Sequence, residues 1–142
     1  MSGFLLDTNV LSEFSRTGSP DERVKRWLEE VPSDSLFASV VTFGEIRFGI
    51  GLLHACDRRT RLERWLENDL HDWFEGRILA VDETVAERWG LLRAQAKLEG
   101  RPLPVIDALL AATALANDLI LATRNASDFR ITGLRLINPW QT

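Results

Sequence analysis

The sequence predicts an α/β domain with a mostly parallel central sheet and helices on both faces of that sheet. Residues 4–6 and 119–122 are apolar throughout, and residues 35–41, 78–81 and 134–137 are short segments of nearly the same character. Strands that are buried on both faces have continuous apolar sequences of this kind. Longer segments with apolar residues at helical spacing separate them, and such alternation is typical of a parallel sheet in a layered domain.

Local signals locate the elements of the first half. The strand at residues 4–6 leads into a polar turn and a helix from about Val10. Asp21 begins a second helix, which Pro32 stops. Thr42 opens a third helix after the strand at residues 35–41. Residues 59–73 continue as a helix with Trp73 on its apolar face, so these last two helices should form a hairpin.

In the second half, Asp82 caps a long helix that ends at Gly100. Pro102 and Pro104 introduce a helix over residues 105–117. Ligands of such folds bind beyond the carboxyl ends of the strands, which share one edge of the sheet. Asp7, after the first strand, and the polar turn at residues 123–128 should therefore lie close together.

Length and composition limit the class of protein. A chain of 142 residues fits one domain, residues 1–142, with a sizeable core. No apolar run approaches the roughly 18 residues that span a membrane. Residues 1–11 carry no basic leader, so we expect the protein in the cytoplasm. Cys56 is the single cysteine, and no Cys/His cluster has zinc-ligand spacing.

The net charge of −4 argues against a domain that holds nucleic acid by overall positive charge. However, 15 of the 17 basic residues are arginines, which suit phosphate recognition. Divalent cations would also reverse the sign of an acidic pocket. Nucleic acid therefore stays open as a partner.

Four carboxylates are candidates for a site. Taken singly, each has an ordinary interpretation as a helix cap, a helix-dipole partner, a solvated helix residue or a turn residue. Taken together, they follow strands or begin helices that a parallel sheet brings to one edge. We therefore interpret them as one cluster: Asp7, Glu45, Asp107 and Asp128.

Clustered carboxylates repel one another and stay ionised together when divalent cations neutralise them. Oxygen ligands favour Mg²⁺ or Mn²⁺ over zinc. Such ions activate water and stabilise the leaving oxygen of a phosphodiester. The cluster therefore indicates phosphodiester hydrolysis.

The chain resembles the PIN-domain nucleases at four segments: LLDTNVL at residues 5–11, TFGE at 42–45, IDALLA at 106–111 and TRNASDF at 123–129. The resemblance covers the whole chain and is strongest to the VapC and FitB toxins of bacterial type II toxin–antitoxin pairs, including NPW at residues 138–140. It implies a three-layer α/β/α domain and an Mg²⁺-dependent RNA endonuclease. It also implies a homodimer and a hetero-oligomer with a small cognate antitoxin protein.

The resemblance also implies roles for individual residues. Asp7 and Asp107 would be the primary metal ligands, Glu45 would complete the site or orient water, and Asp128 would be the fourth acid. Some family members place that acid nearer Asn125, so either position could complete the site. Supporting hydrogen bonds would come from Thr8, Asn9 and Thr123.

Two other functions compete with this one. The segment Asp7-Thr8-Asn9 resembles the nucleophile loop of haloacid-dehalogenase-like phosphatases, but Asn9 replaces the second aspartate of that loop. A non-catalytic PIN-like module that binds RNA or protein is the other alternative. It predicts lost carboxylates, whereas this chain retains four.

Surface residues are harder to assign. The arginines at positions 58, 59, 61 and 64 alternate with Glu63 and Glu67, as on a solvated helix face. Phe37, Phe48, Ile50 and Leu53 could form an antitoxin groove or a dimer contact. Periodicity does not separate these interfaces from the core.

Overall fold

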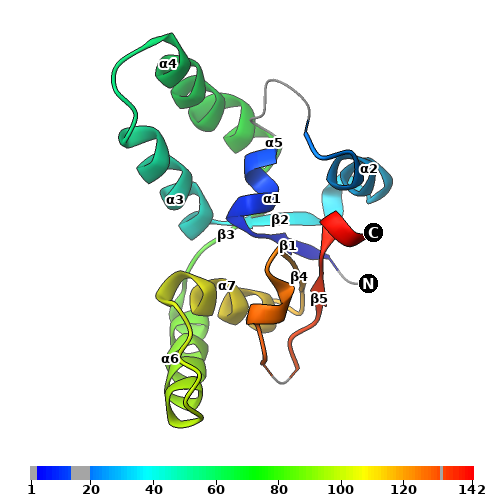
Figure 1. Ribbon diagram of the computed structural model, residues 1–142, viewed down its shortest axis with the longest axis vertical. Coiled ribbons are helices and arrows are strands. Elements are labelled where there is room, and N and C mark those ends of the chain that lie inside the picture. The colour runs from blue at the N-terminus through cyan, green and yellow to red at the C-terminus, as the bar shows by residue number, and fades with distance from the viewer. Residues whose placement is uncertain (1–2, 14–19, 132) are drawn as a thin grey trace.

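The computed structural model describes residues 3–13, 20–131 and 133–142 and confirms the predicted α/β class. Its five strands are β1 (Phe4–Leu6), β2 (Leu36–Ser39), β3 (Ile78–Leu79), β4 (Ile120–Ala122) and β5 (Leu136–Ile137). They pair in parallel in the order β3-β2-β1-β4-β5. Because β1 lies at the centre (Figure 1), whatever follows it is flanked by the ends of β2 and β4.

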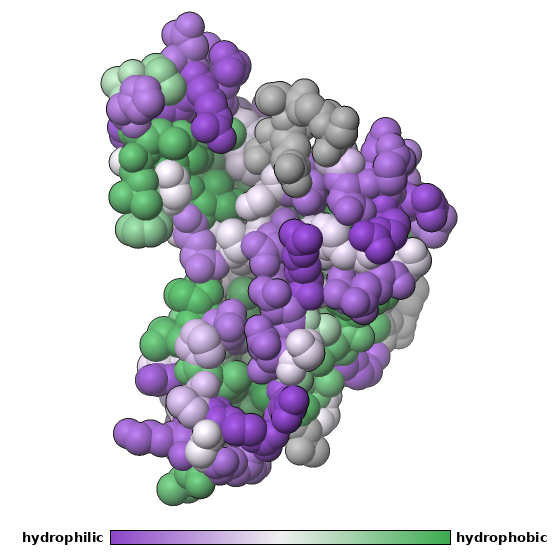
Figure 2. All heavy atoms as spheres, viewed as in Figure 1, coloured by the Kyte–Doolittle hydropathy of each residue, from purple (hydrophilic) through white to green (hydrophobic). Residues whose placement is uncertain are grey.

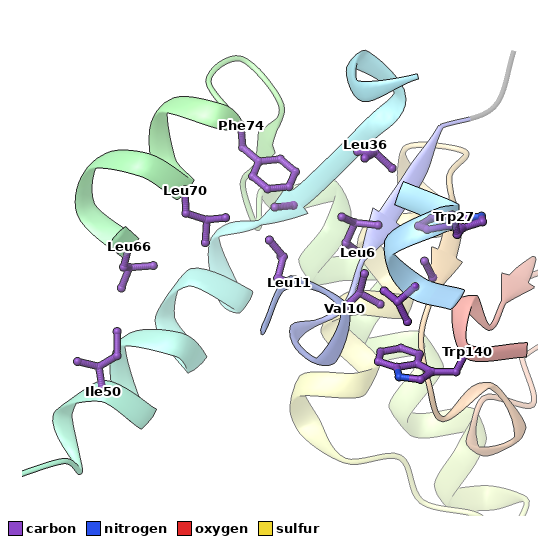
Figure 3. Close-up of a cluster of buried hydrophobic side chains, with 13 residues drawn as sticks. Leu6, Val10, Leu11, Trp27, Leu36, Ile50, Leu66, Leu70, Phe74 and Trp140 are labelled. Carbon is purple, nitrogen blue, oxygen red and sulfur yellow. The ribbon is translucent and has the colours of Figure 1, made fainter. Parts of the chain in front are cut away.

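Side chains of each strand alternate between two cores, as the period of a strand requires. Leu6 faces the core beneath α1 (Thr8–Glu13), α2 (Glu22–Glu30) and α3 (Val40–Gly51), part of which Figure 3 shows. Leu5 faces the opposite core, beneath α7 (Val105–Ala116), against which α6 (Glu83–Leu98) packs. The predicted covering of both faces by helices is thus confirmed.

The arm after α3 is less regular than predicted. It consists of α4 (Asp57–Arg64), a π-helical segment (Trp65–Leu70) and the short α5 (His71–Trp73). The π-helical turn is wider than an α-helical turn and shifts the buried stripe by one residue. Phe74 is therefore fully buried, whereas Trp73, which we predicted on the apolar face, is 39% exposed.

Several element boundaries differ from the prediction. The first helix begins at Thr8 rather than at Val10, and residues 14–19, which follow Glu13, lie outside the described part of the chain. The third begins at Val40 rather than at Thr42, because the Ser39 side chain accepts a hydrogen bond from the Val41 N–H at 3.0 Å. Strands β2, β3, β4 and β5 are also shorter than the apolar segments that predicted them.

Other helix ends match the prediction. Asp21 caps α2 by accepting from the Arg23 N–H at 2.9 Å. Asp82 caps α6 by accepting from the Val85 N–H, also at 2.9 Å. The chain leaves α6 through Gly100, whose φ of +74° is easily reached only by glycine.

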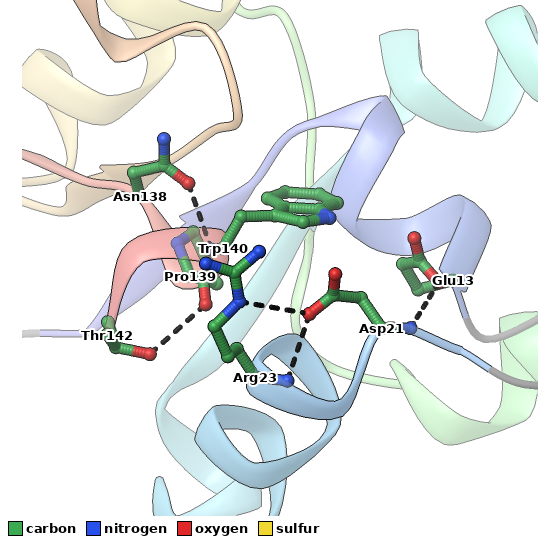
Figure 4. A network of polar contacts seen from close by, with 7 residues as sticks. All are labelled: Glu13, Asp21, Arg23, Asn138, Pro139, Trp140 and Thr142. Atoms are coloured by element: carbon green, nitrogen blue, oxygen red, sulfur yellow. Dashed lines mark hydrogen bonds and ion pairs between the residues drawn. The ribbon is translucent and has the colours of Figure 1, made fainter.

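The end of the chain folds back beside α2 in a 3₁₀ turn, η4 (Pro139–Gln141) (Figure 4). Asn138 accepts from the Trp140 N–H at 2.9 Å and donates to the Arg124 carbonyl at 3.0 Å. The guanidinium of Arg124 lies 5.2 Å from the centre of the buried Trp140 ring. These contacts fasten the loop after β4.

No helix in the described part of the chain is both long and apolar enough to cross a membrane.

The burial of individual leucines predicts which of them support the fold. Leu70 is 2% exposed, whereas Leu98 is 88% exposed. We expect Leu70→Ala to lower the free energy of unfolding by roughly 2–5 kcal/mol through lost burial and a cavity. The matched control Leu98→Ala should change it by less than about 0.5 kcal/mol. Urea unfolding followed by circular dichroism measures both, and equal effects would contradict the described burial of Leu70.

Candidate active site

The structure brings the carboxyl ends of neighbouring strands together beside the starts of two helices. Asp7 directly follows β1, and Glu45 lies in the second turn of α3. Asp107 lies in the first turn of α7. Asp128 ends the 3₁₀ turn η3 (Ala126–Asp128), which follows β4. The starts of α3 and α7 flank an indentation in the outline of the molecule (Figure 2).

Asp7 is held from two directions. One carboxylate oxygen, Oδ1, accepts from the Val10 N–H at 3.1 Å, so this aspartate does cap the following helix. The other, Oδ2, accepts from the hydroxyl of Thr123 at the end of β4. Asp7 and Thr123 are only 6% and 1% exposed. Asp7 therefore caps α1, as its ordinary interpretation predicts, but its second carboxylate oxygen also connects the end of β1 to the end of β4.

Burial raises the pKa of Asp7 above its ordinary value, and the negative charge of Asp107 adds to the increase. Hydrogen bonds from Thr123 and from the backbone of Val10 and Asn9 oppose that effect. Asp7 is thus a carboxylate whose negative charge the fold disfavours in the absence of a positive partner.

The charge of Asp107 interacts with the charges of Glu45 and Asp128. Asp107 is half-buried, and desolvation is the largest cause of its raised pKa. The charges of Glu45 and Asp128 raise the pKa further, so both carboxylates are close enough to repel it. Glu45 is positioned by the Thr8 hydroxyl, which donates to its Oε1 atom.

The turn after β4 bears on the choice of fourth acid. Asp128 is exposed, yet its charge acts on Asp107. Asn125 uses its backbone N–H to donate to the Thr123 hydroxyl at 3.2 Å. The turn therefore directs the Thr123 hydroxyl and carries Asp128 beside Asp107. Which of the two positions, 125 or 128, completes the site stays a prediction.

Within the described residues, no three Asp, Glu, His or Cys side chains already stand in an arrangement that could hold one metal ion. The donor chemistry nevertheless fits a hard divalent cation, because all the donors are carboxylate or hydroxyl oxygens. The raised pKa values of Asp7 and Asp107 have the sign expected for carboxylates that a cation would stabilise.

Two clefts flank the carboxylates. One, of about 250 Å³, lies against α1, α3 and α4 and is lined by Thr8, Glu45, Leu53 and Arg58 among others. The second, of about 370 Å³, lies between α6 and η3 and includes Asp128. We predicted a solvated face for the arginine cluster. This is confirmed for Arg58, Arg61 and Arg64, which are exposed, although Arg58 also lines the first cleft. Arg59 is half-buried and pairs with Glu63 at 4.0 Å.

Comparison with known proteins decides the family. The family model of the PIN domain matches residues 4–133. The chain belongs to the PIN-domain family. The predicted resemblance is therefore confirmed.

Individual relatives of this PIN domain cover almost its whole length. The VapC ribonuclease Y4jK of Sinorhizobium fredii is 37% identical over 137 residues, which are 96% of this chain and 97% of that protein. Toxin FitB of Neisseria gonorrhoeae is 38% identical over 136 residues, again 96% and 97%. The crystal structure of FitAcB from the same organism superposes with a TM-score of 0.90 at 37% identity, covering 98% of this chain and 99% of that one.

The electrostatics of Asp107 predict a stability effect in metal-free protein. Its pKa is raised in the folded state, so folding favours the protonated form. The cost of the ionised form is fully present above the raised pKa and disappears as the pH falls through it. We therefore expect Asp107→Asn to raise the melting temperature in EDTA at pH 7, with a gain that shrinks on acidification. Asp34→Asn, at an exposed turn before β2, is the matched control. A lower melting temperature for Asp107→Asn would contradict the proposed repulsion.

Proposed function

We propose that this PIN domain is a divalent-metal-dependent RNA endonuclease and acts in the cytoplasm as the toxin of a toxin–antitoxin pair. The carboxylate cluster carries the proposal: a buried aspartate, Asp7, follows the central strand, and the charge of Asp107 acts on it. The charges of Glu45 and Asp128 act on Asp107 in turn. The VapC ribonuclease and toxin FitB are similar to this chain over nearly its whole length, which supports the same activity here.

Each residue receives a role from its contacts. Asp7 and Asp107 bind the cation, because they are the two carboxylates whose ionisation the fold opposes. Thr123 fixes the rotamer of Asp7. Glu45, which Thr8 holds, accepts a proton from the attacking water or orients it. Asp128 adds a further negative charge that acts on Asp107.

A bound Mg²⁺ or Mn²⁺ would neutralise these carboxylates and supply Lewis acidity toward a phosphodiester. The protein itself contributes carboxylates that are already in position at this edge of the sheet. Thr8 holds Glu45 and Thr123 holds Asp7 without any ligand. Asn9 and Asn125 are exposed at the same edge and are available to hydrogen-bond RNA.

The first cleft suits the antitoxin. It begins at Glu45 and has apolar walls that include Ile46, Leu53 and Trp65. An extended segment with apolar side chains and one basic residue would fill the walls and place its charge at the acids. We propose that a cognate antitoxin inhibits the toxin in this way.

A homodimer has a different surface available. Phe48 and Leu52, both on the α3 side, are 69% and 71% exposed, and hydrophobic side chains gather over α3 in Figure 2. Of the four residues we considered for an interface, Ile50 is buried and Phe37 packs into a core. We propose that Phe48 contributes to the dimer and Leu53 to the antitoxin cleft.

The nuclease function predicts a specific loss of activity. We expect the protein to cleave a mixed pool of structured RNAs with Mg²⁺ and to leave it intact with EDTA. Asp7→Asn and Asp107→Asn should each reduce cleavage by at least about 100-fold, since residues that only support metal ligands already contribute 10- to 100-fold. Gel analysis of the products gives the rates.

The control for this experiment is Asp34→Asn, which makes the same chemical change outside the proposed site. Cleavage by wild type and both site variants at equal rates would show that a contaminant is responsible. A folded wild-type protein that binds RNA without cleaving it would favour the non-catalytic module.

A further inference from the structure

The second cleft is not explained by the metal site. It has a volume of about 370 Å³ and lies between α6, the connecting segment 99–104 and η3. This volume falls within the range of small-molecule pockets. Apolar side chains form part of its wall, among them Leu92, Ala96 and Ile131, and two arginines, Arg101 and Arg130, also line it.

This cleft is continuous with the acidic edge. Asp128 lines it and also acts electrostatically on Asp107. Pro104, another lining residue, caps α7 three residues before Asp107. A polymer whose phosphate lies at the carboxylates can therefore place its neighbouring unit in the cleft.

The arginines of the cleft are available to an anion. Arg130 is exposed and forms no hydrogen bond or ion pair with any residue that the structure describes. Arg101 pairs with Glu99 at 3.1 Å, but the two side chains are 53% and 45% exposed, so the pair is weak. The chain has a net charge of −4, and these two guanidinium groups lie beside an acidic centre. We therefore expect them to bind a phosphate group rather than a partner rich in carboxylates.

We propose that this cleft is a nucleotide subsite, in which a base of single-stranded RNA packs on Leu92, Ala96 and Ile131 while the adjoining phosphate contacts Arg130 and Arg101. The inference rests on the proposed nuclease function and specifies its substrate. Bases in a duplex are stacked and paired, so only an unpaired nucleotide can insert its base into such a cleft. The aliphatic wall accepts a base face, and the residue at position 96 limits how large a base enters.

Binding measurements test the subsite directly. Full-length Asp107→Asn protein, in which cleavage is suppressed, is titrated with a fluorescent single-stranded RNA in Mg²⁺. We expect an added Arg130→Ala change to weaken binding about tenfold, as loss of a charge-assisted contact would. The slope of log K against log salt should also become shallower by about 0.7, the value for one phosphate of a single strand. Arg26→Ala, on α2, is the matched control and should change neither quantity.

A second variant tests the apolar wall. Ala96→Leu narrows the cleft without altering charge and should change which base flanks the cleavage site of otherwise active protein. A duplex of the same sequence should compete poorly for binding.

If wild type cleaves RNA while Arg130→Ala and Ala96→Leu behave like wild type, the subsite is wrong and the nuclease function stands. If the duplex binds as tightly as the single strand, the base pocket is wrong. If wild type neither binds nor cleaves RNA, both proposals fall.

Discussion

The hydrogen bond from Thr123 to Asp7 is the contact on which the site depends. It joins the residues that directly follow β4 and β1, two neighbouring parallel strands, at the edge where their carboxyl ends meet. The backbone repeats the connection, since the Asp7 N–H donates to the Ala122 carbonyl at 3.0 Å. With Asp7 fixed, the starts of α3 and α7 bring Glu45 and Asp107 beside the same edge. The acidic centre is thus a direct consequence of strand order.

That arrangement has an electrostatic cost, because the carboxylates repel one another and Asp7 is buried. A bound cation would remove the repulsion and would also permit an RNA phosphate to approach a chain with a net charge of −4. The two clefts beside the carboxylates differ in the side chains that line them. The cleft on the α1–α3 side has apolar walls, and the cleft on the α6 side is lined in part by the guanidinium groups of Arg101 and Arg130.

Much of this could be predicted from sequence, because local chemistry decides it. The apolar run before Asp7 and the caps at Asp21 and Asp82 depend on neighbouring residues alone. The position of Phe74 in the core could not be predicted, because the π-helical turn that shifts the register depends on packing against the sheet. Arg130 was also not predicted, since an exposed arginine in a loop carries no local signal until the fold places it beside a cleft.

The most direct test of the central claim is anomalous diffraction from crystals of the full chain soaked in Mn²⁺. The account predicts a manganese peak within coordination distance of the carboxylates of Asp7 and Asp107, roughly 2.0–2.3 Å for an oxygen ligand of such an ion. Absence of a peak at this edge at saturating Mn²⁺, in a preparation that cleaves RNA with the same ion, would contradict it.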